Sequence, residues 1–278
     1  MIHVNLFDNN FAHTQTFGCL TSTSIIPPSK LVWIPRKMEF DGITVFTDGM
    51  IFDPVVDQVK SKLKIAWLME PPSINPWAYN NILHIESKFD YILTFDENLL
   101  RRGEKYLKYI VGQSRVTNEN AKSAGRHPKT KNISLISSGK QMSEGHRFRA
   151  DVVNALHPKY NFDLWGYAYK PFQEKTEPLE DYEFSICIMN SKINNYFTEI
   201  LLDCIRLGTI PIFWGCPNID KYFDVRGMEI FETIEQLDNI LSNLKPYSKY
   251  SPYAGVNFQL SHEFIHTDDY IAEILKTL

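Results

Sequence analysis

Polar side chains gather where an apolar segment ends and a helix is expected to begin, about two thirds of the way along the chain. The segment EFSICIM is followed by Asn190 and Ser191, and the next helix is predicted to open near Tyr196 and Glu199. A helix N-terminus has unpaired N–H groups and about half a positive charge, so phosphates commonly bind there. Glu199 has two interpretations: an acid that favours the helix dipole, or a carboxylate that accepts hydrogen bonds from a ribose diol.

A second cluster, SSGKQMSEGHRFR, follows a predicted strand and opens a predicted helix. It contains Lys140, Arg147 and Arg149, and guanidinium groups bind phosphate oxygens in bidentate fashion. The spacing matches neither a P-loop nor the G-x-G-x-x-G motif. The concentration of basic side chains nevertheless favours a phosphate site, whereas His146 is interpreted as a loop histidine rather than a catalyst.

A third candidate is Glu70, in the segment WLMEPPSINPW. It directly follows an apolar strand and precedes two prolines, which restrict the backbone and hold the preceding residue extended. A carboxylate fixed at the carboxyl end of a strand suits a general base, particularly where apolar surroundings raise its pKa. The alternative is an exposed acid at the end of a strand.

Two α/β domains are expected to position these residues. Apolar, β-rich runs alternate with helix-like segments in both halves, which predicts parallel sheets. In NPWAYNNILHIESKF, Trp77, Ile82 and Ile85 are expected on one helix face. Residues 114–131 contain five basic side chains and one acidic, and predict a flexible linker or, alternatively, a basic lid over an anionic ligand. We predict one domain over 1–131, ending in this linker, and a second over 132–278 with a C-terminal helix.

Composition excludes several classes of protein. The 278 residues are 44% hydrophobic and 22% charged, with a net charge of −4, which is ordinary for globular domains and argues against a general nucleic-acid binder. The four cysteines have no zinc-type spacing and no D-x-D occurs, so we predict no metal ligands. No apolar run approaches ~18 residues and no basic-flanked leader starts the chain. We therefore expect no transmembrane segment, no signal peptide and a cytoplasmic location.

One long segment resembles a known family. CIMNSKINNYFTEILLDCIRLGTIPIFWGCPNIDKYF is similar to the signature of the family 10 glycosyltransferases, the α1,3/1,4-fucosyltransferases. Their pattern runs approximately F-x-N-S, a loop, Y-x-T-E-K, a helix, then G-T-x-P-I-x-W-G-x-P and an aromatic residue. EGHRFRADVVNAL also resembles the arginine-bearing helix start of that family, and WLMEPPS resembles its E-S-P segment in the acceptor domain.

The resemblance implies a GT-B-like α/β fold, in which two Rossmann-like domains face each other across a cleft. It implies an inverting glycosyltransferase that moves L-fucose from GDP-fucose to a hydroxyl of a glycan acceptor, without a required cofactor. The first domain would bind the acceptor, with Glu70 as the general base, and the second the nucleotide sugar. The implied donor-binding residues are Arg149, Arg147, Lys140, Asn190, Ser191, Tyr196 and Glu199. The expected lack of a membrane anchor suits a bacterial or viral enzyme.

Two positions depart from the family pattern. Met189 stands where the family usually has an acid, and Ile200 stands where it has a lysine that helps to neutralise the donor diphosphate. Two alternatives therefore stay open. The protein could use a different nucleotide sugar, or it could be a non-catalytic homologue that binds a sugar nucleotide or a partner.

Overall fold

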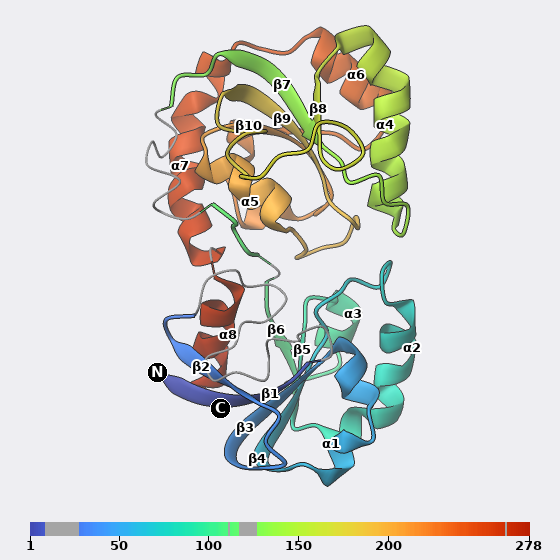
Figure 1. The fold of residues 1–278 in the computed structure, drawn as a ribbon, viewed down its shortest axis with the longest axis vertical. Coiled ribbons are helices and arrows are strands. Elements are labelled where there is room, and N and C mark those ends of the chain that lie inside the picture. The colour runs from blue at the N-terminus through green and yellow to red at the C-terminus, as the bar shows by residue number, and fades with distance from the viewer. Residues whose placement is uncertain (9–27, 111, 117–126, 265) are drawn as a thin grey trace. The chain divides into compact units, whose positions relative to one another are not determined.

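The structure, a computed structural model, describes residues 1–8, 28–110, 112–116, 127–264 and 266–278. These residues form two compact units. The first consists of Met1–Gln113 with His266–Leu278, and the second of Ser114–Ile265. The division differs from the one expected, because the described linker residues 114–116 and 127–131 group with the second unit and the C-terminal helix groups with the first. Figure 1 shows the elements of each unit.

The first unit is built on a six-stranded sheet in the order β2-β1-β3-β4-β5-β6, with all paired strands parallel. Helices α1, α2 and α3 lie on one face of the sheet and α8 on the other (Figure 1). The strands are β1 (Ile2–Phe7), β2 (Leu31–Pro35), β3 (Glu39–Thr47), β4 (Lys60–Trp67), β5 (Tyr91–Thr94) and β6 (Tyr106–Lys108). The helices are the 3₁₀ helix η2 (Asp48–Phe52), α1 (Val55–Gln58), α2 (Pro76–Ile85), the 3₁₀ helix η3 (Glu86–Lys88), α3 (Glu97–Leu100) and α8 (Thr267–Leu275).

Helix α2 begins where its sequence predicts a helix start. The Asn75 side chain accepts a hydrogen bond from the Ala78 backbone N–H, and Pro76 occupies the first turn. Its inner face packs Ala78 and Ile82 into the core beneath the sheet, both fully buried. The expectation that Trp77 shares this face was wrong, because the Trp77 side chain is 56% exposed.

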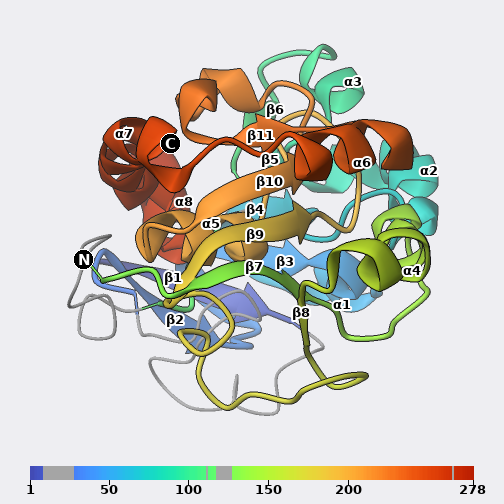
Figure 2. The same cartoon turned by 90° about the horizontal axis from the view of Figure 1, so that it is seen from above.

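The second unit repeats this plan on a five-stranded parallel sheet in the order β11-β10-β9-β7-β8 (Figure 2). Helices α4 and α6 lie on one face, and α5 and α7 on the other (Figure 1). The strands are β7 (Lys131–Ile136), β8 (Asp163–Trp165), β9 (Tyr182–Ile188), β10 (Ile210–Trp214) and β11 (Glu229–Ile230). The main helices are α4 (Glu144–Tyr160), α5 (Glu199–Arg206), α6 (Ile234–Ser242) and α7 (Ser251–Ser261), with 3₁₀ turns η4 (Ile219–Lys221), η5 (Val225–Gly227), η6 (Tyr247–Lys249) and η7 (His262–Phe264).

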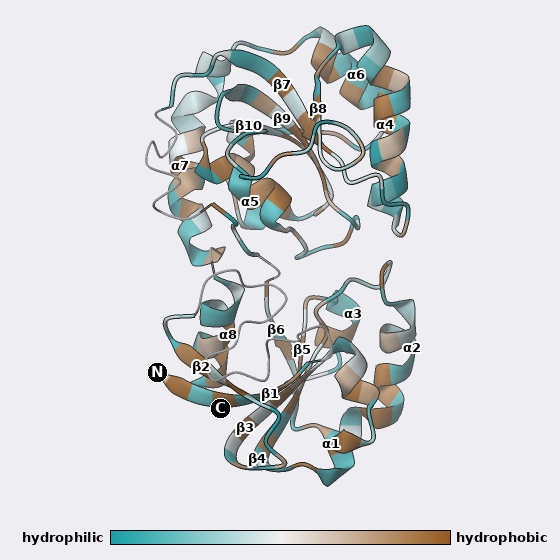
Figure 3. Ribbon diagram, viewed as in Figure 1, coloured by the Kyte–Doolittle hydropathy of each residue, from teal (hydrophilic) through white to brown (hydrophobic). Residues whose placement is uncertain are grey.

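Burial explains why the sequences of these strands are continuous apolar runs. Every residue of β10, and nearly every residue of β9, is buried, because helices cover both faces of a parallel sheet. Figure 3 shows hydrophobic, brown stretches within the strands of each sheet, beside hydrophilic, teal ones. Among the described residues, no helix combines the length and the apolar character needed to cross a membrane.

Two helices near the chain end differ from expectation. Helix α7 was not predicted; in the structure Pro252 lies in its first turn, where proline is tolerated. The predicted C-terminal helix is α8, which is shorter than the polar and apolar pattern of residues 261–278 indicates. His266 has an extended backbone, and α8 starts only at Thr267.

Candidate functional site

The second sheet has a point where the strand order reverses. β8 lies on one side of β7 and β9 on the other, so the loops that follow β7 and β9 leave the same edge in opposite directions. Open α/β sheets bind ligands at such a switch point, beyond the carboxyl ends of the strands. The loop after β7 leads to Ser143 and α4, and the loop after β9 contains Asn190 and Ser191. The two predicted phosphate-binding segments are therefore neighbours.

Arg149 lies at the centre of this edge, on the second turn of α4. Its side chain is only 5% exposed. The Nε atom donates to the Ile188 carbonyl at 3.0 Å and Nη2 donates to the Asn190 side-chain oxygen at 2.7 Å. Burial lowers the pKa of Arg149, while the charges of Glu199 and Tyr196 act in the opposite direction. The structure thus brings four of the predicted residues, Arg149, Asn190, Tyr196 and Glu199, to one place.

Helix α4 starts in direct contact with the loop after β9. The Gly145 backbone N–H donates to the Asn190 carbonyl at 3.1 Å. A Cβ atom at Gly145 would lie 1.8 Å from the Met189 carbonyl oxygen, so only glycine fits here. Sequence reasoning missed this residue, although a glycine in the first turn of a helix is itself a signal of close backbone approach.

Positive charge concentrates at this helix start. The pKa of His146 falls to about 4, first because the ring is buried and then because of the charges of Arg149, Lys140 and Arg147. The His146 ring nitrogen Nδ1 instead contacts the Ser143 hydroxyl at 2.9 Å, as part of a capping box. His146 is therefore neutral near pH 7, in a structural role, while Lys140 and Arg147 are exposed.

Helix α5 begins later than expected, at Glu199, with Thr198 as its N-cap residue. Tyr196 lies in the preceding loop and is 2% exposed. This loop turns at Asn195, which has a left-handed backbone with φ of 63°. The Asn195 side chain accepts hydrogen bonds from the Asn218 amide at 3.0 Å and the Tyr222 hydroxyl at 2.6 Å. The WGCPN segment after β10 therefore supports the loop, a role that the sequence analysis did not assign.

The two positions that depart from the family pattern have different surroundings. Met189 is fully buried and its sulfur accepts a 3.8 Å hydrogen bond from the Thr198 hydroxyl. Ile200 is half-buried on the first turn of α5. Ser191 is buried in the same loop as Asn190, with 3% exposure.

The first sheet carries acids at the equivalent edge. Its strand order also reverses, between β1 and β3. Asp8 directly follows β1, Asp48 directly follows β3, and Glu70 lies three residues beyond β4. Glu70 is exposed, and its backbone is fixed by a hydrogen bond from the Tyr79 hydroxyl to its carbonyl at 3.0 Å.

Asp48 supports Glu70 and was missed by the sequence analysis. Its Oδ1 atom accepts from the Met69 backbone N–H at 3.0 Å and more weakly from that of Glu70 at 3.4 Å. Burial raises the pKa of Asp48 to about 6, and the charges of Glu70 and Asp8 add to the rise. The dipeptide Asp48-Gly49 after a strand was the available signal, but it also fits an ordinary turn.

Two lysines of the predicted basic linker form hydrogen bonds and an ion pair with residues of the second unit. Lys129 donates to the carbonyls of Glu180 at 2.8 Å and Leu207 at 2.7 Å, and Lys131 pairs with Asp181 at 3.0 Å. These lysines are therefore bound to the second unit. The predicted lid otherwise falls on residues 117–126, which lie outside the described residues. Within the described ranges, no group of three or more His, Cys, Asp or Glu side chains could hold a metal ion.

Comparisons with known proteins point to one family. Residues 126–254 match the model of the glycosyltransferase family 10 (fucosyltransferase) C-terminal region. A segment is 31% identical over 99 residues to the alpha-(1,3)-fucosyltransferase FucT of Helicobacter pylori, covering 34% of this chain. The match spans 20% of that relative, about a fifth of its length.

Solved structures show the same fold. A crystal structure of an α1,3-fucosyltransferase with GDP matches with a TM-score of 0.58 at 17% identity, covering 88% of this chain and 81% of that one. A crystal structure of an α1,3-fucosyltransferase with GDP-fucose matches with a TM-score of 0.54 at 17% identity, covering 87% and 81%. Together with the two parallel sheets, these matches confirm the predicted GT-B-like α/β fold class. The resemblance inferred from the sequence is also confirmed over residues 126–254, by their match to the glycosyltransferase family 10 (fucosyltransferase) C-terminal model.

Proposed function

We propose that this protein is an inverting fucosyltransferase that moves L-fucose from GDP-fucose to a hydroxyl of a glycan acceptor. The observation that carries the proposal is the gathering of Arg149, Asn190, Tyr196 and Glu199 at the switch point of the second sheet. The family match of this domain supports the reaction class. The GDP-fucose complex of a protein with the same fold supports the donor.

The second unit would hold the nucleotide sugar. Arg149 offers a buried guanidinium, and charge-assisted hydrogen bonds from such groups to phosphate are strong. Lys140 and Arg147 add positive charge near the same helix start, which takes over the role of the family lysine replaced by Ile200. Glu199 would accept hydrogen bonds from the ribose hydroxyls. These groups stabilise the negative charge that develops on the leaving diphosphate.

The first unit would supply the base. The Glu70 carboxylate takes the proton of the acceptor hydroxyl while the acceptor oxygen bonds to the anomeric carbon. The bond from that carbon to the diphosphate oxygen breaks in the same step, so GDP leaves and the configuration inverts. Asp48 positions Glu70 through its hydrogen bonds to the backbone at residues 69 and 70.

Ile200 favours a second candidate, a glycosyltransferase of this fold that uses another nucleotide sugar. A thermal-shift panel of GDP, UDP, ADP and CDP and their sugars separates the two, because a ligand at ~100 times its Kd adds about 2.7 kcal/mol to the free energy of unfolding. Stabilisation by GDP and GDP-fucose alone supports the first proposal. A larger shift with UDP or ADP compounds would move the assignment to the second.

Donor binding is tested by calorimetry with GDP. Arg149→Ala is expected to weaken GDP binding by about ten- to a hundredfold, because hydrogen bonds to charged groups contribute ~1.5–3 kcal/mol. Since Arg149 is buried, the exposed Arg147→Ala provides a second variant with little risk to folding, and a smaller loss is expected. Arg226→Ala, an exposed arginine paired with Asp224, is the control and should bind GDP as the wild type does. Unchanged affinity in both Arg149→Ala and Arg147→Ala contradicts the proposed donor site.

The base is tested by Glu70→Gln. Transfer from GDP-fucose should fall by ~10²–10⁴-fold, the usual contribution of a general base, while the affinity for GDP stays the same. Glu39→Gln is the matched control, because Glu39 is an exposed acid at the start of β3, the opposite edge of the same sheet. A Glu70→Gln enzyme with wild-type turnover would show that another group removes the proton.

A further inference from the structure

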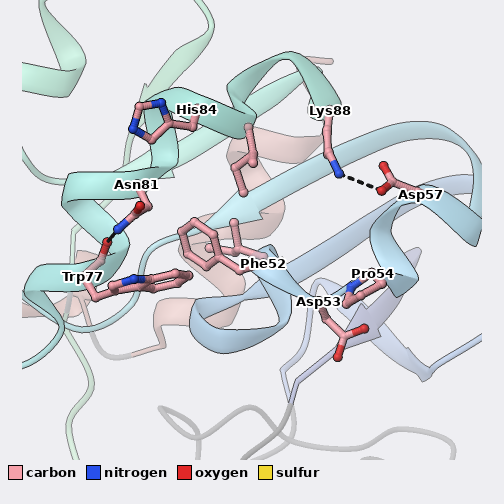
Figure 4. A pocket seen from close by; sticks show the side chains of 10 residues that line it. Phe52, Asp53, Pro54, Asp57, Trp77, Asn81, His84 and Lys88 are labelled. Carbon is pink, nitrogen blue, oxygen red and sulfur yellow. Dashed lines mark hydrogen bonds and ion pairs between the residues drawn. The ribbon is translucent and has the colours of Figure 1, made fainter.

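A groove in the first unit is not used by the mechanism above. It has a volume of about 330 Å³, within the range of small-molecule pockets (~300–1,000 Å³). One wall is formed by the segment from η2 to α1, with Phe52, Asp53 and Asp57. The other is formed by α2, with Trp77 and His84 (Figure 4).

Trp77 is unusual among the tryptophans of this chain. Its side chain is 56% exposed, whereas the other four, Trp33, Trp67, Trp165 and Trp214, are at most 6% exposed. The Trp77 ring is held by an edge-to-face contact with Phe52, with ring centroids 4.3 Å apart. The ring therefore packs against Phe52 while more than half of Trp77 is open to solvent. The electron-rich face of an aromatic ring attracts the slightly positive C–H groups on one side of a sugar ring.

The polar groups of the groove fit a neutral, hydroxyl-rich ligand. Asn81, His84 and Asp53 offer an amide, an imidazole and a carboxylate, so both donors and acceptors line the walls. The Asp57 carboxylate and the Lys88 ammonium pair with each other at 2.6 Å. A phosphate site would require more basic than acidic side chains, and this groove does not have such an excess. Sugar hydroxyls both donate and accept hydrogen bonds, so they fit this mixture of groups.

A hydrogen bond and a short chain segment connect the groove to the proposed base. Tyr79 belongs to α2, between Trp77 and Asn81, and its hydroxyl donates to the Glu70 carbonyl at 3.0 Å. Only Pro71 to Pro76 separate Glu70 from Trp77 in the chain, and the Asn75 cap fixes the start of the helix. Glu70 and the α2 wall of the groove are therefore held by the same short segment.

We propose that this groove is a subsite for a sugar ring of the acceptor glycan, stacked on Trp77. The proposal rests on the fucosyltransferase function, since it places a second ring of the acceptor near the chain segment that carries the base. The ligand class is a neutral oligosaccharide, with the ring that receives fucose bound elsewhere and a further ring in the groove.

The exposure of Trp77 allows a direct test that does not depend on activity. A printed array of neutral oligosaccharides is first screened with labelled protein, with N-acetyllactosamine and its trimer as solution probes. Acrylamide quenching of tryptophan fluorescence is then measured with and without the tightest-binding glycan. The quenchable part of the emission should come from Trp77, so it should disappear in Trp77→Phe and be protected by the glycan in the wild type.

The KM for the acceptor, measured in variants of the groove, provides a second test. Trp77→Ala should raise the KM for the acceptor about tenfold, with kcat and the KM for GDP-fucose unchanged, because only the stacking contact is lost. Asn81→Ala should act in the same direction. Leu83→Ala is the matched control, since Leu83 is 40% exposed on the same helix and does not line the groove.

The outcomes separate this proposal from the proposed function. If the wild type neither binds GDP nor transfers fucose, the function is wrong, but glycan protection of Trp77 still supports a sugar site. If transfer occurs and Trp77 stays equally quenchable at saturating glycan, the subsite is wrong and the function stands. Absence of any glycan binding on the array also overturns the subsite.

Discussion

Between helix α4 and the segment after β9, position 145 has room for a hydrogen atom and nothing larger. The Gly145 amide bonds to the Asn190 carbonyl at 3.1 Å, and Asn190 in turn accepts from Arg149 at 2.7 Å. A single glycine therefore sets the distance between the helix that carries the arginine and the loop that carries its partner.

Gly145→Ala is expected to destabilise the protein by about 1–3 kcal/mol, the usual cost of forcing an extra methyl into a packed contact. It should also weaken GDP binding, because the start of α4 must move away from Met189. Urea denaturation and calorimetry measure the two effects. Gly255→Ala is the control: its Cβ would meet nothing within 4 Å, so the change on α7 should be neutral or stabilise by up to ~1 kcal/mol. Equal behaviour of the two variants would contradict this account.

At the scale of elements, α5 connects the candidate site to the start of the second unit. Glu199 opens the helix at the site, and Asp203 follows one turn later, fully buried. Asp203 Oδ1 accepts from the Ser114 hydroxyl at 2.8 Å and from the Arg115 amide at 2.7 Å. Arg206 binds the Val116 carbonyl at 3.2 Å. Residues 114–116 are therefore held by α5 rather than free, as a flexible linker would be.

Asp203 should make stability depend on pH. Burial raises its pKa from 3.8 to about 6, so the folded state binds this proton more tightly than the unfolded state. Its contribution to the free energy of unfolding is full below pH 3.8 and is lost as pH rises through about 6. The shift corresponds to about 3 kcal/mol. Relative to Asp203→Asn, the wild type should therefore lose up to this amount as pH rises from about 3.8 to about 6.

Urea denaturation across this pH range measures the difference between the two proteins. Asp238→Asn is the control, because hydrogen bonds from Lys159 and Tyr160 lower the pKa of Asp238, which then titrates below the range. Parallel stability curves for the wild type and Asp203→Asn would show that Asp203 does not titrate as described.

At the scale of the whole molecule, both chain ends belong to the first unit, and the second unit is inserted between them. Helix α8 completes the first unit through two buried acids. Asp269 accepts from the backbone N–H groups of Ser29 and Lys30, both at 2.8 Å, and Asp268 accepts from the Trp33 indole at 3.1 Å. The residues that precede and open β2 therefore depend on the last helix of the chain.

Asp269→Ala should destabilise the first unit by about 1–3 kcal/mol, because two backbone donors lose their acceptor. Hydrogen exchange read by mass spectrometry should become faster in β2 and α8, while the GDP affinity of the second unit stays the same. Glu273→Ala is the control on the same helix; its exposed carboxylate pairs with Lys30 and Lys276, and exposed pairs contribute at most ~1 kcal/mol. Faster exchange in the second unit alone would contradict the assignment of α8.

Much of the fold could be predicted from the sequence because parallel strands are buried on both faces. Runs such as ISLI and IPIFW are continuously apolar for that reason, and each became a strand. The segments of the candidate site could also be recognised, since chain order and polarity mark the loops after β7 and β9. Gly145, Asp48 and Asn218 could not be assigned, because each role depends on a partner distant in sequence or on a close backbone approach.

The sequence by itself determined the alternation of strands and helices, the parallel sheets and the family-like motif around Tyr196 and Glu199, because these follow from local polarity and spacing. Only the tertiary structure decided that α8 joins the first unit, that Asp48 rather than a proline alone positions Glu70, and that Trp77 faces solvent. Those features arise from contacts between segments as far as 240 residues apart. Such contacts form only when the chain has folded, so no local pattern records them.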